Sequence, residues 1–137
     1  MPVIIREFRA NDYEAAVELW EAGDIRVETR EDVEFKLQRD PDLFLVAEEN
    51  GQLVGVVLGA FDGRIGSINR LAVAEPARRS GLAGRLIEAV EERLRAKGAR
   101  RVWAWIHDYN RPSRALFSGR GYNEWRDVVT VSKSLIA

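Results

Sequence analysis

The sequence contains no cysteine and only one histidine. Without cysteine the chain forms no disulfide, offers no thiolate to a metal ion and has no cysteine nucleophile. A single histidine excludes a metal site built from several imidazoles. These absences remove the commonest thiol and transition-metal chemistries, and we expect a protein that works without a metal.

The sequence also lacks a long apolar run and a strong net charge. No hydrophobic stretch approaches the ~20 residues of a membrane-spanning helix, and Arg6 and Arg9 come too early for a signal peptide. The formal net charge of −1 gives no global attraction to nucleic acid or acidic lipid, so any anion site must be local. We therefore expect a cytoplasmic protein with no nucleic-acid and no membrane partner.

The composition is that of a single globular domain. Of the 137 residues, 46% are hydrophobic and 31% are charged, which suits one core of ordinary size. No repeat, linker or low-complexity stretch divides the chain. The expectation is one domain over residues 1–137.

Apolar periodicity and turn signals predict a mixed α+β fold. Asn50-Gly51 and Asp62-Gly63 are hairpin signals between apolar runs. Strands are expected at 3–8, 43–48, 52–59, 65–73 and 101–106, with a last pair at Tyr122–Trp125 and Val128–Ser132. About four helices are expected, ending at Gly23, starting at Thr29, and covering 83–97 and 111–118. This order predicts a mostly antiparallel mixed sheet with helices on its faces.

The stretch from Ser67 to Ala96 organises the rest of the chain. A buried strand ends before Pro76, and a wide apolar stripe marks a long helix that starts near Leu82. Between them small residues leave backbone N–H groups uncovered at a helix start, where the helix dipole favours an anion such as a phosphate. The residues of this turn are Arg78, Arg79, Ser80, Gly81, Leu82, Ala83 and Gly84.

The turn matches neither a Walker loop nor the G-x-G-x-x-G fingerprint. Its pattern is Arg78-x-x-Gly81-x-Ala83 after Leu71-Ala72-Val73. In this it resembles the GNAT superfamily of acyl-CoA-dependent N-acyltransferases, of the small RimI-like type, whose pyrophosphate signature is Arg/Gln-x-x-Gly-x-Gly/Ala. The alternative is an ordinary strand–helix junction with solvated arginines. The resemblance covers nearly the whole chain and is firmest from Leu71 to Tyr122.

The resemblance implies a GNAT fold, with its sheet splayed between the fourth and fifth strands, and acetyl-CoA as co-substrate. The diphosphate would lie on the 78–84 turn, and the pantetheine arm would pair with the open strand edge at Leu71, Ala72 and Val73. The Val73 N–H would stabilise the thioester oxyanion. A second motif, from Asn110 to Tyr122, would place Asn110, Ser113 and Phe117 beside the cofactor, although Asn110 could equally only cap a short helix.

The sequence departs from the family at the acid and base positions. The usual acid, a tyrosine, is Phe117, and the usual glutamate positions hold Trp105 and Ser67. Because a thiol pKa lies near ~8.5, water can protonate the leaving thiolate. As base we favour a water relay ordered by Ser67 and Asn69. The other candidates are Asp24, Glu28, Glu75, His107 and Asp108 as bases, and Tyr109 and Tyr122 as proton donors or packing groups.

The resemblance implies that the acceptor is a primary amine on a small molecule or a protein N-terminus. By resemblance its specificity comes from residues 23–29 and the segment around Asp127. Three arginines either hold an acceptor carboxylate or pair with nearby acids; they are Arg26, Arg30 and Arg70. The four tryptophans are expected in the core, and family members often form homodimers.

Three functions are compatible with these features. An active N-acetyltransferase is the hypothesis that we favour. An acyl-CoA-binding module without turnover is the second, and Phe117 speaks for it. A nucleic-acid binder that uses Arg78, Arg79 and Arg85 is the third, and the net charge speaks against it.

Overall fold

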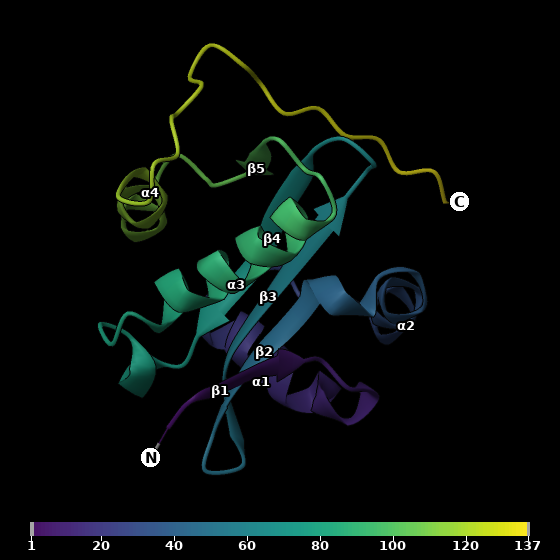
Figure 1. Cartoon of the computed structure of the whole chain (residues 1–137), viewed down its shortest axis with the longest axis vertical. Coiled ribbons are helices and arrows are strands. Elements are labelled where there is room, and N and C mark those ends of the chain that lie inside the picture. The colour runs from purple at the N-terminus through teal and green to yellow at the C-terminus, as the bar shows by residue number, and fades with distance from the viewer. Residues whose placement is uncertain (1, 137) are drawn as a thin grey trace. The chain divides into compact units, whose positions relative to one another are not determined.

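The computed structural model describes residues 2–136. The chain divides into two compact units, one up to Trp105 and one from Ile106 onward. The first unit holds a five-stranded sheet in the order β1-β2-β3-β4-β5 (Figure 1). Its strands are β1 Ile4–Glu7, β2 Phe44–Glu49, β3 Gln52–Phe61, β4 Gly66–Val73 and β5 Val102–Ala104. All neighbours are antiparallel except β4 and β5, which are parallel, so the predicted mixed sheet is confirmed.

Three α-helices of the first unit cover the two faces of this sheet. They are α1 Tyr13–Ala22, α2 Arg30–Arg39 and α3 Leu82–Ala96. The core on one face joins α1 and α2 to β2, β3 and β4 through residues such as Trp20, Val33 and Val56. Helix α3 lies on the other face (Figure 1), and its buried apolar side chains pack there against β3 and β4. Both faces are thus buried, as the sequence pattern requires.

The turns form where their sequences predict them. Asn50 and Gly51 both have positive φ, 54° and 77°, as a type I′ hairpin turn requires. Asp62 shapes the second turn, because its Oδ1 accepts the N–H groups of Arg64 and Ile65, each at 2.9 Å. Thr29 caps α2 by accepting the N–H of Asp32 at 3.1 Å.

Helix α3 lies directly on glycines of the sheet, a feature that was not predicted. Three glycines of β3 and β4 face three α3 residues spaced four apart. A Cβ on these glycines would come within 2.8, 2.7 and 2.6 Å of the facing side chain. The pairs are Gly55 with Leu86, Gly59 with Val90, and Gly66 with Leu94. These close contacts fix the position of α3 along the sheet, and so the place where α3 begins relative to β4.

A bulge interrupts β4. Val56 pairs with Ala72 and Leu58 with Asn69, so two residues of β4 oppose one of β3. Arg70, within the bulge, has φ 55°, and its carbonyl accepts the indole N–H of Trp20 at 3.0 Å. The pairing of β4 with β5 spans only Gly66 to Ile68 on the β4 side. The expected splay between the fourth and fifth strands is therefore present.

The second unit contains α4, Arg111–Ser118, with the predicted bounds. The predicted strand pair at 122–132 is wrong, because the structure assigns no strand to residues 106–136. Hydrophobic side chains of the segment after α4 are largely exposed: Val129 is 81% exposed and Leu135 is 91% exposed. Alternating β-branched residues favour a strand only where a neighbouring edge accepts their hydrogen bonds, and here no pairing is made.

The expectation that all four tryptophans are core residues is also wrong. Trp20 is fully buried, but Trp105 and Trp125 are more than half exposed. Among residues 2–136, no helix has the length and apolarity to cross a bilayer.

Candidate functional site

The turn before α3 presents unpaired backbone donors. A short 3₁₀ helix, Glu75–Ala77, leads into it, and Arg79 and Gly81 adopt positive φ of 72° and 82°. Gly81 is the N-cap of α3 and provides no side-chain cap. The first backbone bond into the helix runs from the Arg85 N–H to the Gly81 carbonyl at 3.1 Å. The N–H groups of the first helical turn, at residues 82–84, therefore have no acceptor within α3.

The free edge of β4 lies next to this turn. The Ala74 N–H donates to the Val54 carbonyl at 2.9 Å, toward β3. Because successive N–H groups of a strand point to opposite edges, the Val73 N–H points away from β3. Within residues 2–136 no strand pairs with that edge beyond Ile68. The Val73 carbonyl at this edge accepts the Nε–H of Arg78 at 3.0 Å.

These donors fit the diphosphate and amide groups of acetyl-CoA. Three helix-start amides and two exposed arginines, Arg78 and Arg79, gather at one end of α3. The edge with a free N–H at Val73 adjoins them through the Arg78 contact. The sequence predicted both features, and the structure brings them together. The roles of Leu71, Ala72, Val73 and residues 78–84 in binding remain predictions.

Ser67 and Asn69 lie on the face of β4 opposite α3. Gly66 packs against Leu94 of α3, so the alternating side chains of Ser67 and Asn69 point to the α1–α2 face. In the described part of the chain neither side chain has a hydrogen-bond partner. Val73 comes six positions after Ser67, which corresponds to up to ~20 Å of strand at ~3.3 Å per residue. Asn69 is therefore the nearer of the two to the Val73 amide, and the water relay remains a prediction.

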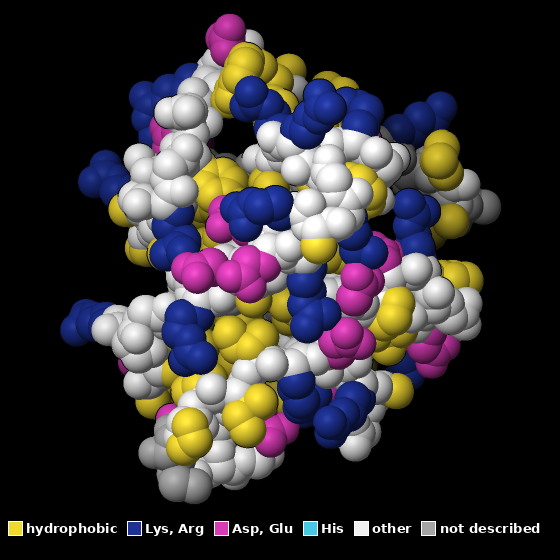
Figure 2. All heavy atoms as spheres, in the orientation of Figure 1, with side chains coloured by type: hydrophobic (Ala, Val, Ile, Leu, Met, Phe, Trp, Pro, Cys, Tyr) yellow, Lys and Arg dark blue, Asp and Glu magenta, His cyan; other side chains and the backbone are white. Residues whose placement is uncertain are grey.

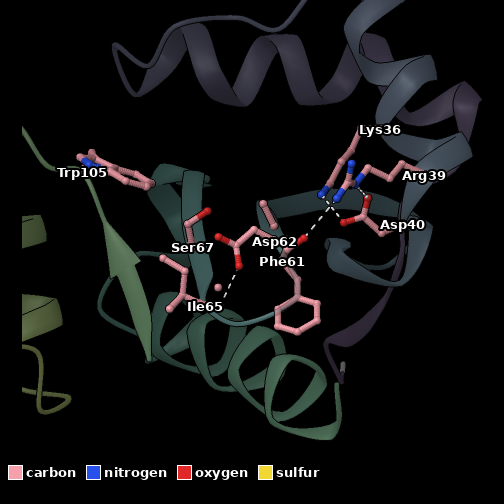
Figure 3. Close-up of a pocket in the computed structure, with 10 residues that line it drawn as sticks. Lys36, Arg39, Asp40, Phe61, Asp62, Ile65, Ser67 and Trp105 are labelled. Carbon is pink, nitrogen blue, oxygen red and sulfur yellow. Dashed lines mark hydrogen bonds and ion pairs between the residues drawn. The ribbon is translucent and has the colours of Figure 1, made fainter. Parts of the chain in front are cut away.

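A cavity of about 360 Å³ opens on this same face. Figure 3 shows Ser67 and the indole of Trp105 on one side of it, and the end of α2 on the other. There Lys36 Nζ lies 2.8 Å from Asp40 Oδ2, and both side chains are largely buried. Arg39 Nη2 donates to the Phe61 carbonyl at 3.3 Å. The two positions at which the family resemblance expects a glutamate thus line one cavity.

Sequence reasoning missed the α2 side of this cavity. The i, i+4 spacing of Lys36 and Asp40 signals an ion pair on a helix. Nothing in the sequence shows that the end of α2 meets the turn between β3 and β4. That proximity follows from the packing of α2 across the sheet.

Two of the arginines proposed for a carboxylate are paired within the chain. Arg70 Nε lies 2.9 Å from Glu28 Oε1, an ion pair whose angle falls outside hydrogen-bond geometry. Arg30 pairs with Glu14 and lies 4.4 Å from the ring centroid of Tyr13. Arg70 and Arg30 therefore pair with acidic residues of the chain, which was the alternative to binding an acceptor carboxylate. The pairing of Glu28 also makes it a poorer candidate for the base.

In the second unit, Asn110 caps α4. Its Oδ1 accepts the N–H of Ser113 at 3.2 Å, so the predicted cap is confirmed and a cofactor contact stays a prediction. Phe117 is only 6% exposed and meets the ring of Tyr122 edge-on at 5.0 Å. His107 stacks on Tyr109 at 5.0 Å.

A chain of charge-assisted bonds joins α4 to the following segment. Arg114 Nε donates to Glu124 Oε2 at 2.7 Å, and Arg126 Nε donates to Oε1 at 3.1 Å. The bonds from Arg114 and then Arg126 lower the pKa of the Glu124 carboxyl to about 2. This group therefore stays ionised at neutral pH.

Across the middle of the face shown in Figure 2, where α3 lies in Figure 1, dark-blue Lys and Arg side chains lie next to magenta Asp and Glu side chains. This part of the first unit does not form the continuous basic stripe that nucleic-acid binders display, so it gives the nucleic-acid hypothesis no support.

Comparisons with known proteins agree with the geometry. Residues 5–122 match the acetyltransferase (GNAT) family. An acetyltransferase of Pectobacterium atrosepticum is 39% identical over 135 residues, which cover 96% of this chain and 95% of that one. The chain therefore belongs to the GNAT family, the class of acyl-CoA-dependent N-acetyltransferases.

Solved structures share the fold at lower identity. Ard1 from Thermoplasma volcanium is 22% identical, with a TM-score of 0.82 over 96% of this chain and 86% of that one. The diaminobutyrate acetyltransferase EctA from Paenibacillus lautus, solved with L-2,4-diaminobutyric acid and coenzyme A, is 24% identical. Its TM-score is 0.78 over 87% of this chain and 74% of that one. These likenesses concern the fold.

Proposed function

We propose that this chain, as a single domain over residues 1–137, transfers the acetyl group of acetyl-CoA to a primary amine by direct attack in a ternary complex. The observation that carries this proposal is the adjacency of the free β4 edge at Val73 and the unpaired amides at residues 82–84. A diphosphate and an amide-bearing arm are what these two sets of donors would bind together.

The binding residues follow from that adjacency. The helix-start amides, with Arg78 and Arg79, would hold the diphosphate, and Leu71, Ala72 and Val73 would pair with the pantetheine arm. By family resemblance Asn110, Ser113 and Phe117 would also contact the cofactor. The substrate supplies an acetyl group that is activated as a thioester. The Val73 N–H would donate to the thioester oxygen as negative charge develops there, an effect often worth ~3 kcal/mol.

Proton transfer falls largely to water. The acceptor amine loses a proton as its nitrogen bonds to the carbonyl carbon, and the C–S bond breaks to release a thiolate. A phenyl ring at Phe117 donates no proton, so water protonates the thiolate. Asn69, with Ser67 farther along β4, would orient the water that takes the amine proton.

The acceptor would enter on the α1–α2 face of β4. The cavity of about 360 Å³ beside Ser67 and Trp105 lies on this face, but up to ~20 Å along the strand from Val73, so it would not hold the reacting amine itself. The fold relative EctA was solved with a small diamine. We therefore favour a small amine acceptor, with a protein N-terminus as the alternative. The RimI-like subtype, a cytoplasmic location and a homodimer remain predictions.

A catalytically weak acyl-CoA-binding module is the second candidate, because Phe117 replaces the usual proton donor. A thiol-release assay with acetyl-CoA across a panel of primary amines, together with calorimetric binding of CoA, separates the two. Amine-dependent CoA release supports the enzyme. Binding without release supports the module, and the absence of both contradicts the two proposals.

A further inference from the structure

Arg78 connects the two halves of the proposed cofactor site. Its backbone N–H closes the 3₁₀ turn on the Glu75 carbonyl at 3.1 Å. Its side chain reaches back along the chain, and Nε–H donates to the Val73 carbonyl at 3.0 Å. The side chain of Arg78, the first residue of the 78–84 turn, therefore occupies the free edge of β4.

This contact lies where an added strand would pair. The Val73 N–H and carbonyl point to the same edge of the strand, away from β3. A donor 3.0 Å from that carbonyl takes the position that a pantetheine amide would need. An incoming arm must displace the guanidinium before it can pair with both groups of Val73.

The two possible partners of Arg78 differ in strength. A guanidinium bonded to phosphate pairs two opposite charges and often forms two parallel hydrogen bonds, whereas its contact with the Val73 carbonyl is one bond to a neutral acceptor. The Arg78 side chain is exposed and starts in the turn that carries the unpaired amides, so it is free to turn toward an anion there. Exchange of the Val73 carbonyl for a phosphate is thus favourable for Arg78.

We propose that Arg78 is a positioning residue that covers the β4 edge at Val73 and uncovers it when a diphosphate recruits its guanidinium to the turn. This inference rests on the proposed function. It makes the edge selective, because a pantetheine arm without a diphosphate must break the Arg78 contact with no compensation. A ligand that carries both groups gains a phosphate contact as it uncovers the edge.

Two probes test this exchange by calorimetry: CoA, and pantetheine, which has the arm but no phosphate. Arg78→Ala removes both the cover and the phosphate contact. We expect CoA to bind on the order of tenfold to a hundredfold more weakly, from the loss of a hydrogen bond to a charged group. We expect pantetheine to bind roughly twofold to tenfold more tightly, because the edge is already open.

Arg79→Ala is the matched control, since Arg79 is an exposed arginine of the same turn with no contact to Val73 in the described residues. It should weaken CoA binding and leave pantetheine binding unchanged. Circular dichroism of both variants checks that they are folded. A merely structural role for Arg78 would weaken both ligands, so the opposite signs are the diagnostic result.

The outcomes separate the two proposals. If the wild type binds CoA but Arg78→Ala leaves pantetheine binding unchanged or weaker, the covering role of Arg78 is overturned while the proposed function stands. If the wild type binds neither CoA nor pantetheine, both are overturned. Tighter pantetheine binding in Arg78→Ala and not in Arg79→Ala supports the inference.

Discussion

Leu94 of α3 lies against Gly66 of β4 so closely that a Cβ on the glycine would come within 2.6 Å of Leu94 Cδ1. We expect Gly66→Ala to overpack this contact and to lower the free energy of unfolding by about 1–3 kcal/mol. Chemical denaturation at neutral pH measures this change. The contact matters for the proposed function because it positions the helix whose first turn presents the unpaired amides at residues 82–84.

A double-mutant cycle isolates the cause of that destabilisation. Leu94→Ala alone should cost about 2–5 kcal/mol through the cavity that it leaves. In the Leu94→Ala background, Gly66→Ala should cost clearly less than in the wild type, because the methyl group then has room. An equal cost in both backgrounds would show that crowding by Leu94 is not the reason.

Gly81→Asp should abolish CoA binding, because it places a carboxylate beside the proposed diphosphate turn. The matched control is Gly98→Asp, beyond the other end of α3. Both glycines have positive φ, 82° and 97°, and neither has an atom within 4 Å of a built Cβ. Each substitution thus carries a similar backbone cost of roughly 1–2 kcal/mol. CoA calorimetry should lose its signal only for Gly81→Asp, and a similar loss in both variants would point to general destabilisation.

The pH dependence of kcat/KM should follow the acceptor amine. The chain lacks the glutamate that the family resemblance expects as the base, so the reactive species is the amine that is already neutral. The pKa of its ammonium form is near ~8 for an α-amine and ~10.4 for a lysine-like amine. The acidic limb of the profile should therefore shift when the amine changes. An acidic limb that does not change with the amine, and that is lost in His107→Ala, would instead identify His107 as the base.

Asp12 should make the first unit acid-sensitive. Its two carboxylate oxygens accept Arg6 Nη1 and Nη2 at 2.8 and 3.0 Å, and Oδ2 also accepts the Arg9 N–H at 2.8 Å. Burial raises the pKa of Asp12, but the bonds from Arg6 and Arg9 outweigh it, so the pKa lies below the ordinary 3.8. A lowered pKa in the folded state stabilises the fold above the unfolded value, and that contribution is lost as the pH falls.

Asp12→Asn tests this linkage. At pH 7 the variant should be less stable than the wild type by about 1–3 kcal/mol, the cost of removing charge-assisted bonds from Arg6. The difference should shrink as the pH falls below about 3.8 and the wild-type carboxyl is protonated. Urea unfolding of both proteins between pH 7 and pH 2 measures it, and a difference that does not vary with pH would refute the role of Asp12.

Local signals in the sequence predicted most of the first unit. Asn50-Gly51 and Asp62-Gly63 define their turns, Thr29 caps α2, and the spacing of Leu82, Leu86 and Val90 marks the buried stripe of α3. Each of these features depends on neighbours within a few residues. The turn before α3 was predicted for the same reason.

Features that depend on distant neighbours were missed. The seat of Val90 on Gly59, the bulge at Arg70 and the meeting of α2 with Phe61 all join segments far apart in the chain. The strand predicted around Val129 was wrong for a related reason. Its alternating residues favour a strand, but no neighbouring strand pairs with this segment in the structure. The exposure of Trp105 likewise reflects the cavity that it lines.

The most direct test of the central claim is a map of backbone amide chemical shifts in ¹⁵N-labelled protein as CoA is added. The account predicts the largest changes at residues 82–84 and at Leu71 and Val73, with the amides around the Asn50-Gly51 turn unmoved. Saturating CoA that leaves residues 71–73 and 82–84 unperturbed would contradict it.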